Sequence, residues 1–417
     1  MRYVHAHGTT SGGAVRLSTA AVRGFLVCAV LVGCTSHEGA PPQTTQATTV
    51  EAPTVSEAPP SPTPTAGPTD RSEAPSDGPT GRAEVLVWAD GTIVDGPSLD
   101  LGEARRVRLG SDVEHVRDVP AEPGKVVHLE DLRPDGSFLT VAGDAGLTGG
   151  GGGSVGALRE VSEGRERTLT SPHDADADMR DQISQARRVD GGVAWVEPYV
   201  ELAGQRLVLA PTGSSRGRLV HQLWAVDGRI AALARWGAVL ADGRVVGWDG
   251  KVSGEPADLD LEVSHRVAGD DVVETRCSLQ GCEIVLLTEG GKRQPLLRGP
   301  SGTWVDDSDG RFLLVHVDGG DGVSELWGVD IVDRTAVHIV GELYAQSMSD
   351  GRIVDQDHPA TRAVVVDLVA RTVEQLGVDG SASVAGIAGG LVALTSHDGE
   401  GAGADGDGGD ILRWPRR

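Results

Sequence analysis

The chain has 417 residues, with 61 acidic residues against 37 lysines and arginines, so its formal net charge is −24. A protein this acidic lacks the basic patch that nucleic acids require, which excludes nucleic-acid binding. Hydrophobic residues make up 39% of the sequence, which is too few for a polytopic membrane protein.

The first 33 residues have the layout of an export signal. They contain three arginines and no acidic residue, and an apolar run from Gly24 to Gly33 ends just before Cys34. A positive flank followed by a short apolar stretch and small residues is typical of a secretory signal peptide. The run is about half as long as the ~20 residues of a membrane-spanning helix. We therefore expect residues 1–33 to be a signal peptide.

The tetrad Leu31-Val32-Gly33-Cys34 ends this run and resembles the lipobox of bacterial lipoproteins. The resemblance implies that Cys34 receives a diacylglyceryl group and becomes the mature N-terminus, on the outer face of the cell membrane. An ordinary signal peptide with a chance cysteine is the alternative. Removal of three arginines takes the formal net charge to −27. The low lysine content, three residues in all, fits an actinobacterial type of genome.

Residues 34–82 have the composition of a tether. Threonine, proline, alanine, serine and glutamate dominate, and ten of the 22 prolines lie here. Such a segment cannot bury enough apolar surface to fold, so the sequence predicts a disordered spacer after the lipidated cysteine.

The remaining body, residues 83–417, is predicted to be all-β. Short runs rich in valine, leucine and isoleucine alternate with Asp-Gly and Gly-Gly turns. A turn of this type recurs at seven glycines, with intervals of 37, 41, 41, 41 and 39 residues after a first interval of 55. They are Gly136, Gly191, Gly228, Gly269, Gly310, Gly351 and Gly390. A period near 40 with four strand-like runs indicates a β-propeller with four-stranded blades.

The last repeat is complete through its third strand, at residues 411–414, and then the chain stops. We expect the N-terminal strand at residues 84–95 to supply the missing fourth strand and close the ring. Closure removes exposed sheet edges, which favours a monomer. The sequence predicts a single propeller of seven blades, with six or eight as alternatives. In period and strand pattern this body resembles the TolB-like and WD40-like propellers of bacterial lipoproteins.

Two cysteines remain after Cys28 is removed with the signal and Cys34 is lipidated. Cys277 ends an expected strand at 272–277, and Cys282 begins the next one at 282–287, after a four-residue turn. Cysteines facing each other across such a hairpin have the separation that a disulfide needs, and an exported protein is in an oxidising environment. We therefore expect a structural disulfide between them.

No catalytic motif is present: the histidines are scattered, and there is no nucleophile elbow or P-loop. The best metal candidates are Asp405, Asp407 and Asp410, in a glycine-rich loop that could hold Ca²⁺. We favour a solvated loop there, and expect no cofactor.

These features favour a non-catalytic surface lipoprotein that binds a protein, peptide or glycan through loops on one propeller face. An extracytoplasmic hydrolase or lyase, with acids converging from several blades, is the alternative. The propeller fold supports both, so whether the protein is an enzyme stays open, with binding favoured.

Overall fold

The computed structural model describes residues 85–120, 125–144, 157–171, 183–199, 204–224, 228–257, 261–318, 324–343, 347–356, 362–377, 382–396 and 408–416. All of them belong to one compact unit, Pro75–Arg417. The expected signal peptide, Cys34 and the tether lie outside the described residues and stay predictions. Within the described part, no helix is long and apolar enough to cross a membrane.

The described strands group into seven antiparallel units of four, here named A to G. Unit A contains β5 (Lys125–Leu132), β6 (Phe138–Asp144), β7 (Ala157–Ser162) and β8 (Arg165–Leu169). Unit B contains β9 (Gln185–Val189), β10 (Gly192–Tyr199), β11 (Gly204–Pro211) and β12 (Arg218–Trp224). Unit C contains β13 (Ile230–Ala234), β14 (Gly237–Leu240), β15 (Val245–Gly247) and β16 (Val252–Ser253).

The later units repeat this order. Unit D contains β17 (Glu262–Ala268), β18 (Asp271–Ser278), β19 (Gly281–Thr288) and β20 (Lys292–Gly299). Unit E contains β21 (Thr303–Ser308), β22 (Phe312–Asp318), β23 (Ser324–Asp330) and β24 (Thr335–Val340). Unit F contains β25 (Ser347–Ser349), β26 (Arg352–Gln356), β27 (Arg362–Asp367) and β28 (Thr372–Gly377). Unit G contains β29 (Ala382–Ala388), β30 (Leu391–Ser396), β31 (Gly409–Arg413) and, from the other end of the chain, β4 (Glu114–Val119).

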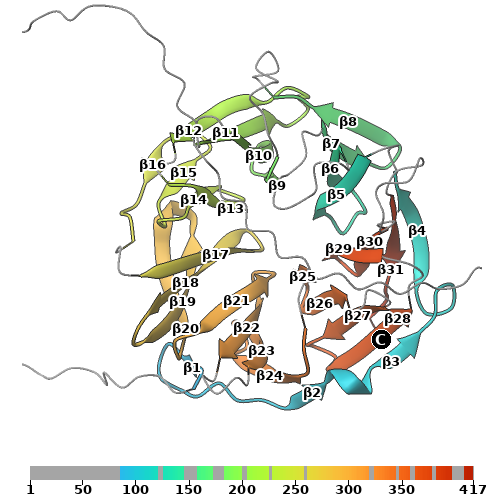
Figure 1. Ribbon diagram of the computed structural model, residues 1–417, viewed down its shortest axis with the longest axis vertical. Coiled ribbons are helices and arrows are strands. Elements are labelled where there is room, and N and C mark those ends of the chain that lie inside the picture. The colour runs from blue at the N-terminus through green and yellow to red at the C-terminus, as the bar shows by residue number, and fades with distance from the viewer. Residues whose placement is uncertain are drawn as a thin grey trace, which may run out of the picture. The chain divides into compact units, whose positions relative to one another are not determined.

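The units form a closed circle, which establishes the β-propeller (Figure 1). The first strand of each unit contacts the first strand of the next, in the order β5, β9, β13, β17, β21, β25, β29 and back to β5. Seven hydrophobic clusters lie between neighbouring units, one for each pair. Each sheet therefore buries both of its faces, because strand side chains alternate between two neighbours.

The strand that closes the ring differs from our expectation. The segment at residues 84–95 forms only β1 (Val87–Trp88), which pairs with β20 at the outer edge of unit D. The fourth strand of unit G is instead β4, which pairs with β31. The apolar side chains of the earlier segment explain this placement, because Leu86, Trp88 and Val94 are buried in the core between units D and E.

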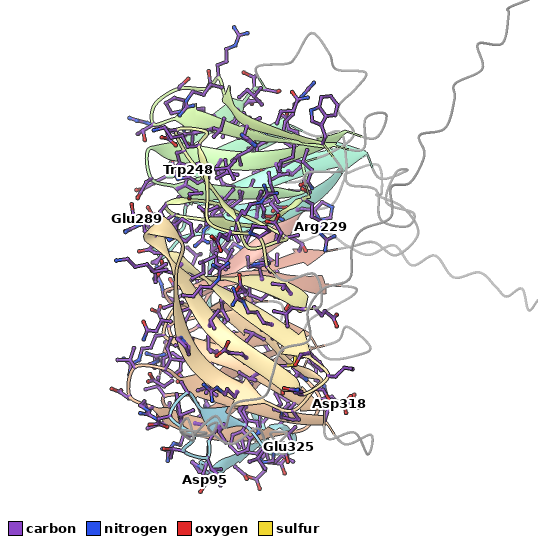
Figure 2. The ribbon with its side chains drawn as sticks, turned by 90° about the vertical axis from the view of Figure 1, so that its left-hand side faces the viewer. Asp95, Arg229, Trp248, Glu289, Asp318 and Glu325 are labelled. Atoms are coloured by element: carbon purple, nitrogen blue, oxygen red, sulfur yellow. A yellow bond between two sulfur atoms is a disulfide. The ribbon has the colours of Figure 1, made fainter. Side chains whose placement is uncertain are left out.

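Between β1 and β4 the chain follows the outer rim of the ring. The strands β2 (Ser98–Asp100) and β3 (Arg105–Val107) add in parallel to β24 and β28, with a 3₁₀ turn at Leu101–Glu103 between them (Figure 1). A second 3₁₀ turn, Glu289–Gly291, follows β19. Seen on edge, Glu289 lies at one face of the ring and Asp318, at the end of β22, at the other (Figure 2).

Local geometry agrees with the sequence patterns. All seven repeat glycines have positive φ, between 58° and 96°, which glycine adopts without steric cost. The predicted disulfide is present: Cys277 and Cys282 are directly paired across β18 and β19, with Cα atoms 4.1 Å apart. Its turn is shorter than predicted, because the strands extend to Ser278 and Gly281.

Candidate functional site

The inner strands of all seven units surround a central channel with a cavity of about 530 Å³. Small or aliphatic side chains form much of its wall, including Ala186, Ala232, Leu233 and Ile387. Charged side chains from four units interrupt this wall: Glu130, Asp131 and Arg133 of unit A, Arg187 of unit B, Arg266 of unit D, and Asp307 and Asp309 of unit E. This volume is within the range of small-molecule sites, which combine apolar walls with a few polar groups.

β-Bulges shape the inner strands where they face the channel. In β5, Leu129 pairs with Thr140 and Asp131 with Leu139, which leaves Glu130 as the extra residue. The same irregularity occurs in β13, β21 and β29, where the extra residues are Ala231, Asp306 and Ala385. A bulge bends its strand and redirects side chains, and this one recurs at the equivalent position of four units. In unit A it brings two successive acidic residues to the channel.

Glu130 and Asp307 are carboxyl groups whose ionised forms are disfavoured. Desolvation by the surrounding protein raises the pKa of Glu130 to about 7, and the charge of Asp131 adds a smaller increase. A hydrogen bond from the backbone of Ala186 acts in the opposite direction and lowers this pKa. Desolvation likewise raises the pKa of Asp307 to about 7, although backbone N–H groups favour its charge. With pKa values near 7, each group is present in both its protonated and its ionised form near neutral pH.

The arginines of the channel are occupied by the protein itself. Arg187 donates to the carbonyl oxygens of Leu233, at 2.9 Å, and Gly269, which joins units B, C and D. Burial lowers its pKa. Arg266 donates to the carbonyl oxygens of Asp306, at 2.9 Å, and His265, at 3.2 Å. Among the described residues, neither Glu130 nor Asp307 forms an ion pair with a basic side chain.

Behind the channel wall, unit D contains a buried charge network. His265 lines the channel, and its Nε2 lies 3.2 Å from Glu274, whose side chain is fully buried. Arg276 and Arg293 contact the same carboxylate, the latter at 3.1 Å. Desolvation alone would raise the pKa of Glu274, but hydrogen bonds from His265 and Arg293 and the charges of both arginines outweigh it and lower the pKa to about 2. The Glu274 carboxylate therefore links His265 of the channel wall to Arg276 and Arg293 behind it.

The sequence-predicted site residues lie elsewhere. Cys277 and Cys282 are in the β18–β19 hairpin and are not among the residues that line the channel. Asp405 and Asp407 lie outside the described residues. Asp410 is on β31, where it meets His115 and Asp118 of β4, a grouping that sequence reasoning missed.

Sequence reasoning also missed Glu130 and Asp307. The available signal was a pair of acidic residues inside an apolar strand, Glu130-Asp131 and Asp306-Asp307, shortly before the repeat glycine. Such a pair interrupts the continuous apolar run that is typical of a strand with two buried faces.

No protein-family model matches the sequence, and no curated protein matches it. Several solved structures resemble the fold. Virginiamycin B lyase from Staphylococcus aureus has a TM-score of 0.44 and 10% identity, over 72% of this chain and 98% of that chain. Oligogalacturonate lyase from Vibrio parahaemolyticus has a TM-score of 0.46 and 11% identity, over 73% and 98%. A puromycin-hydrolysing peptidase from Mycobacterium tuberculosis has a TM-score of 0.42 and 11% identity, over 70% and 53%. At such identities the likeness concerns the β-propeller fold alone.

Proposed function

We propose that this protein is a lipid-anchored binding protein outside the cytoplasm, and that its central channel holds a positively charged group of a peptide ligand. The observation that carries the proposal is the channel itself, a cavity of about 530 Å³ with two carboxyl groups that have no ion-pair partner among the described residues. Pockets of this size accept a side chain or a short peptide end.

The charge of the channel selects the class of ligand. Glu130 and Asp307 are costly to ionise in the free protein, and a bound cation would remove that cost by offering an opposite charge. Arg187 and Arg266 donate to carbonyl oxygens and form no ion pair with these two carboxylates among the described residues, although the charge of Arg266 favours ionisation of Asp307. The formal net charge of −27 after removal of the signal peptide also attracts cationic partners from a distance.

The anchor and the location are supported by the sequence alone. The tetrad Leu31–Cys34 follows a short apolar run and precedes a proline-rich spacer. Two acyl chains on Cys34 would hold the protein stably at a membrane. Cys34→Ala should release the protein from the membrane fraction, and full retention of this variant would contradict the anchor.

The binding proposal is tested by photo-crosslinking on intact cells. A benzoylphenylalanine placed at Ser349, in the channel wall, should capture a ligand, whereas the same group at Ser253, on the outer strand β16, should not. Mass spectrometry of the adducts should identify peptides with lysine, arginine or a free amino terminus. Equal capture from both positions, or adducts that are only glycans, would contradict the proposal.

A direct measurement complements the cellular one. Calorimetry with Gly-Lys-Gly and Gly-norleucine-Gly as probes, both acetylated at the amino terminus and amidated at the carboxyl terminus, should show tighter binding of the lysine peptide. Its affinity should rise between pH 6 and pH 8, because deprotonation of Glu130 and Asp307 provides the negative charge. The variants Glu130→Gln and Asp307→Asn should each remove part of that preference. Equal affinity for both peptides would contradict a cation site.

Hydrolase or lyase activity is the second candidate function. It is favoured by the two carboxyl groups with pKa values near 7, which is the range that suits general acid–base catalysis. Incubation of captured ligands with the protein distinguishes the two functions. A binding protein returns them unchanged, whereas an enzyme converts them at a rate that Glu130→Gln or Asp307→Asn lowers by 10²-fold or more.

A further inference from the structure

The ring closes where β4 pairs with β31, and we call this strand pair the seam. It brings together three side chains of residue types that bind metal ions. His115 and Asp118 lie on β4 and Asp410 on β31, at opposite ends of the folded chain. The Nε2 atom of His115 lies 3.0 Å from an oxygen of Asp118 and 3.1 Å from an oxygen of Asp410. Their potential ligand atoms all lie within 4.8 Å of one another.

A β-bulge creates this arrangement. Residues three apart on a regular strand point to opposite faces, so His115 and Asp118 would normally be separated. In β4, however, Arg117 pairs with Ile411 and His115 with Leu412, which leaves Val116 as an extra residue. Because of this extra residue, the side chains of His115 and Asp118 lie on the same face of the sheet, next to Asp410. Bulges commonly redirect side chains in this way near functional sites.

The two carboxylates of the seam have no arginine or lysine partner among the described residues, and the side chain that pairs with both is His115. Asp118 and Asp410 are paired directly across the two strands, a placement that is destabilising for like charges. Their side chains remain 81% and 55% exposed and that of His115 43%, so an ion can reach all three from solvent. A neutral imidazole donates a single N–H and cannot neutralise both carboxylates.

We propose that His115, Asp118 and Asp410 bind a divalent transition-metal ion, with Zn²⁺ as the reference ion, and that this ion fastens the ends of the ring. Neighbouring ligand atoms in tetrahedral or octahedral sites with bonds of about 2.0–2.1 Å lie about 2.9–3.4 Å apart. Both distances from the Nε2 atom fall in this range. An imidazole ligand favours zinc and its neighbours over Ca²⁺, which prefers oxygen ligands alone.

The site would couple metal binding to ring closure. The ion joins β4 to β31, and in the described residues no other strand completes unit G. Binding to the folded state alone stabilises it in proportion to the logarithm of the ratio of free metal to the dissociation constant. The ligand set supplies three protein atoms, which leaves further coordination positions to water.

The test uses the full-length chain without an affinity tag, stripped with EDTA and dialysed. Titration with ZnCl₂ should show one ion bound per chain with a micromolar dissociation constant. At a hundredfold excess over that constant, the melting temperature should rise by about 4 °C. CaCl₂ at the same concentration should produce less than a quarter of this rise.

Variants decide whether these three residues are the ligands. His115→Ala and Asp410→Asn should weaken zinc binding at least tenfold and abolish the rise in melting temperature. His221→Ala, which removes a partly exposed strand histidine from β12, should behave as the wild type. Melting in EDTA shows whether each variant is folded before metal is added. Wild-type affinity weaker than 100 μM, or unchanged zinc binding by the folded His115→Ala variant, would overturn the assignment.

Discussion

Replacing Glu274 with glutamine removes the only carboxylate that neutralises Arg276 and Arg293 within the buried network of unit D, as far as the described residues show. The carboxylate is fully buried, and its pKa is lowered from its ordinary value of 4.5 to about 2. A difference of this size corresponds to about 3 kcal/mol of stability at neutral pH. Removing one partner of a buried ion pair generally costs a similar amount, about 3–5 kcal/mol.

The expected result can be stated for both temperature and pH. An unfolding entropy of about 2 cal/mol/K per residue over the propeller converts ~3 kcal/mol into a fall in melting temperature of about 4 °C. Because the pKa of Glu274 is lowered on folding, its contribution is complete above the ordinary value and is lost as the pH falls towards 2. The difference between wild type and Glu274→Gln should therefore shrink to about half near pH ~3.2.

The assay is thermal unfolding followed by circular dichroism at several pH values. Glu283→Gln is the matched control, since Glu283 is on the neighbouring strand β19 and its partner Arg298 lies 4.0 Å away on the surface. That change should alter stability by less than about 1 kcal/mol. If Glu274→Gln melts within 1 °C of the wild type at pH 7, or if the difference does not change with pH, the buried network does not stabilise unit D as argued.

Three further predictions concern the hairpin, the seam and the channel. The double variant Cys277→Ser/Cys282→Ser should lose about 2 kcal/mol of stability, because the disulfide closes a short loop. Dithiothreitol should destabilise the wild type by the same amount and leave the stability of the variant unchanged. Val119→Asp puts a charge into the core between units G and A and should prevent ring closure, seen as faster proteolysis near the C-terminus. Glu130→Gln/Asp307→Asn should release fewer protons on binding Gly-Lys-Gly at pH 7, measured by calorimetry in buffers of different ionisation enthalpy; equal release would contradict their role.

Much of the fold was predictable because it is encoded locally. In the repeat around Gly310, apolar runs predict strands at residues 303–306, 311–316, 324–330 and 335–340. These correspond to β21–β24 within about two residues at each end. The disulfide was predictable for the same reason, since a hairpin sets the register between residues five apart. Runs of apolar residues and turn glycines are sufficient to specify such strands.

The closing strand could not be recognised locally. The segment at residues 84–95 has the apolar character of a strand, yet its tryptophan at position 88 is buried between units D and E. The strand that completes unit G, β4, contains four polar or charged residues among six. Its partner is nearly 300 residues away in the sequence, and pairing over such a separation depends on the assembled ring.

The candidate sites were decided by tertiary structure. Glu130 and Asp307 are ordinary acidic residues in the sequence, and only the surrounding wall of the channel removes the water that would keep their pKa values low. His115 and Asp410 meet only because the ring closes between β4 and β31. The sequence by itself determined the all-β repeat, its turns and its disulfide, since these depend on neighbours along the chain. The channel, the raised pKa values of its carboxyl groups and the seam depend on contacts between distant units, and only the folded ring brings those together.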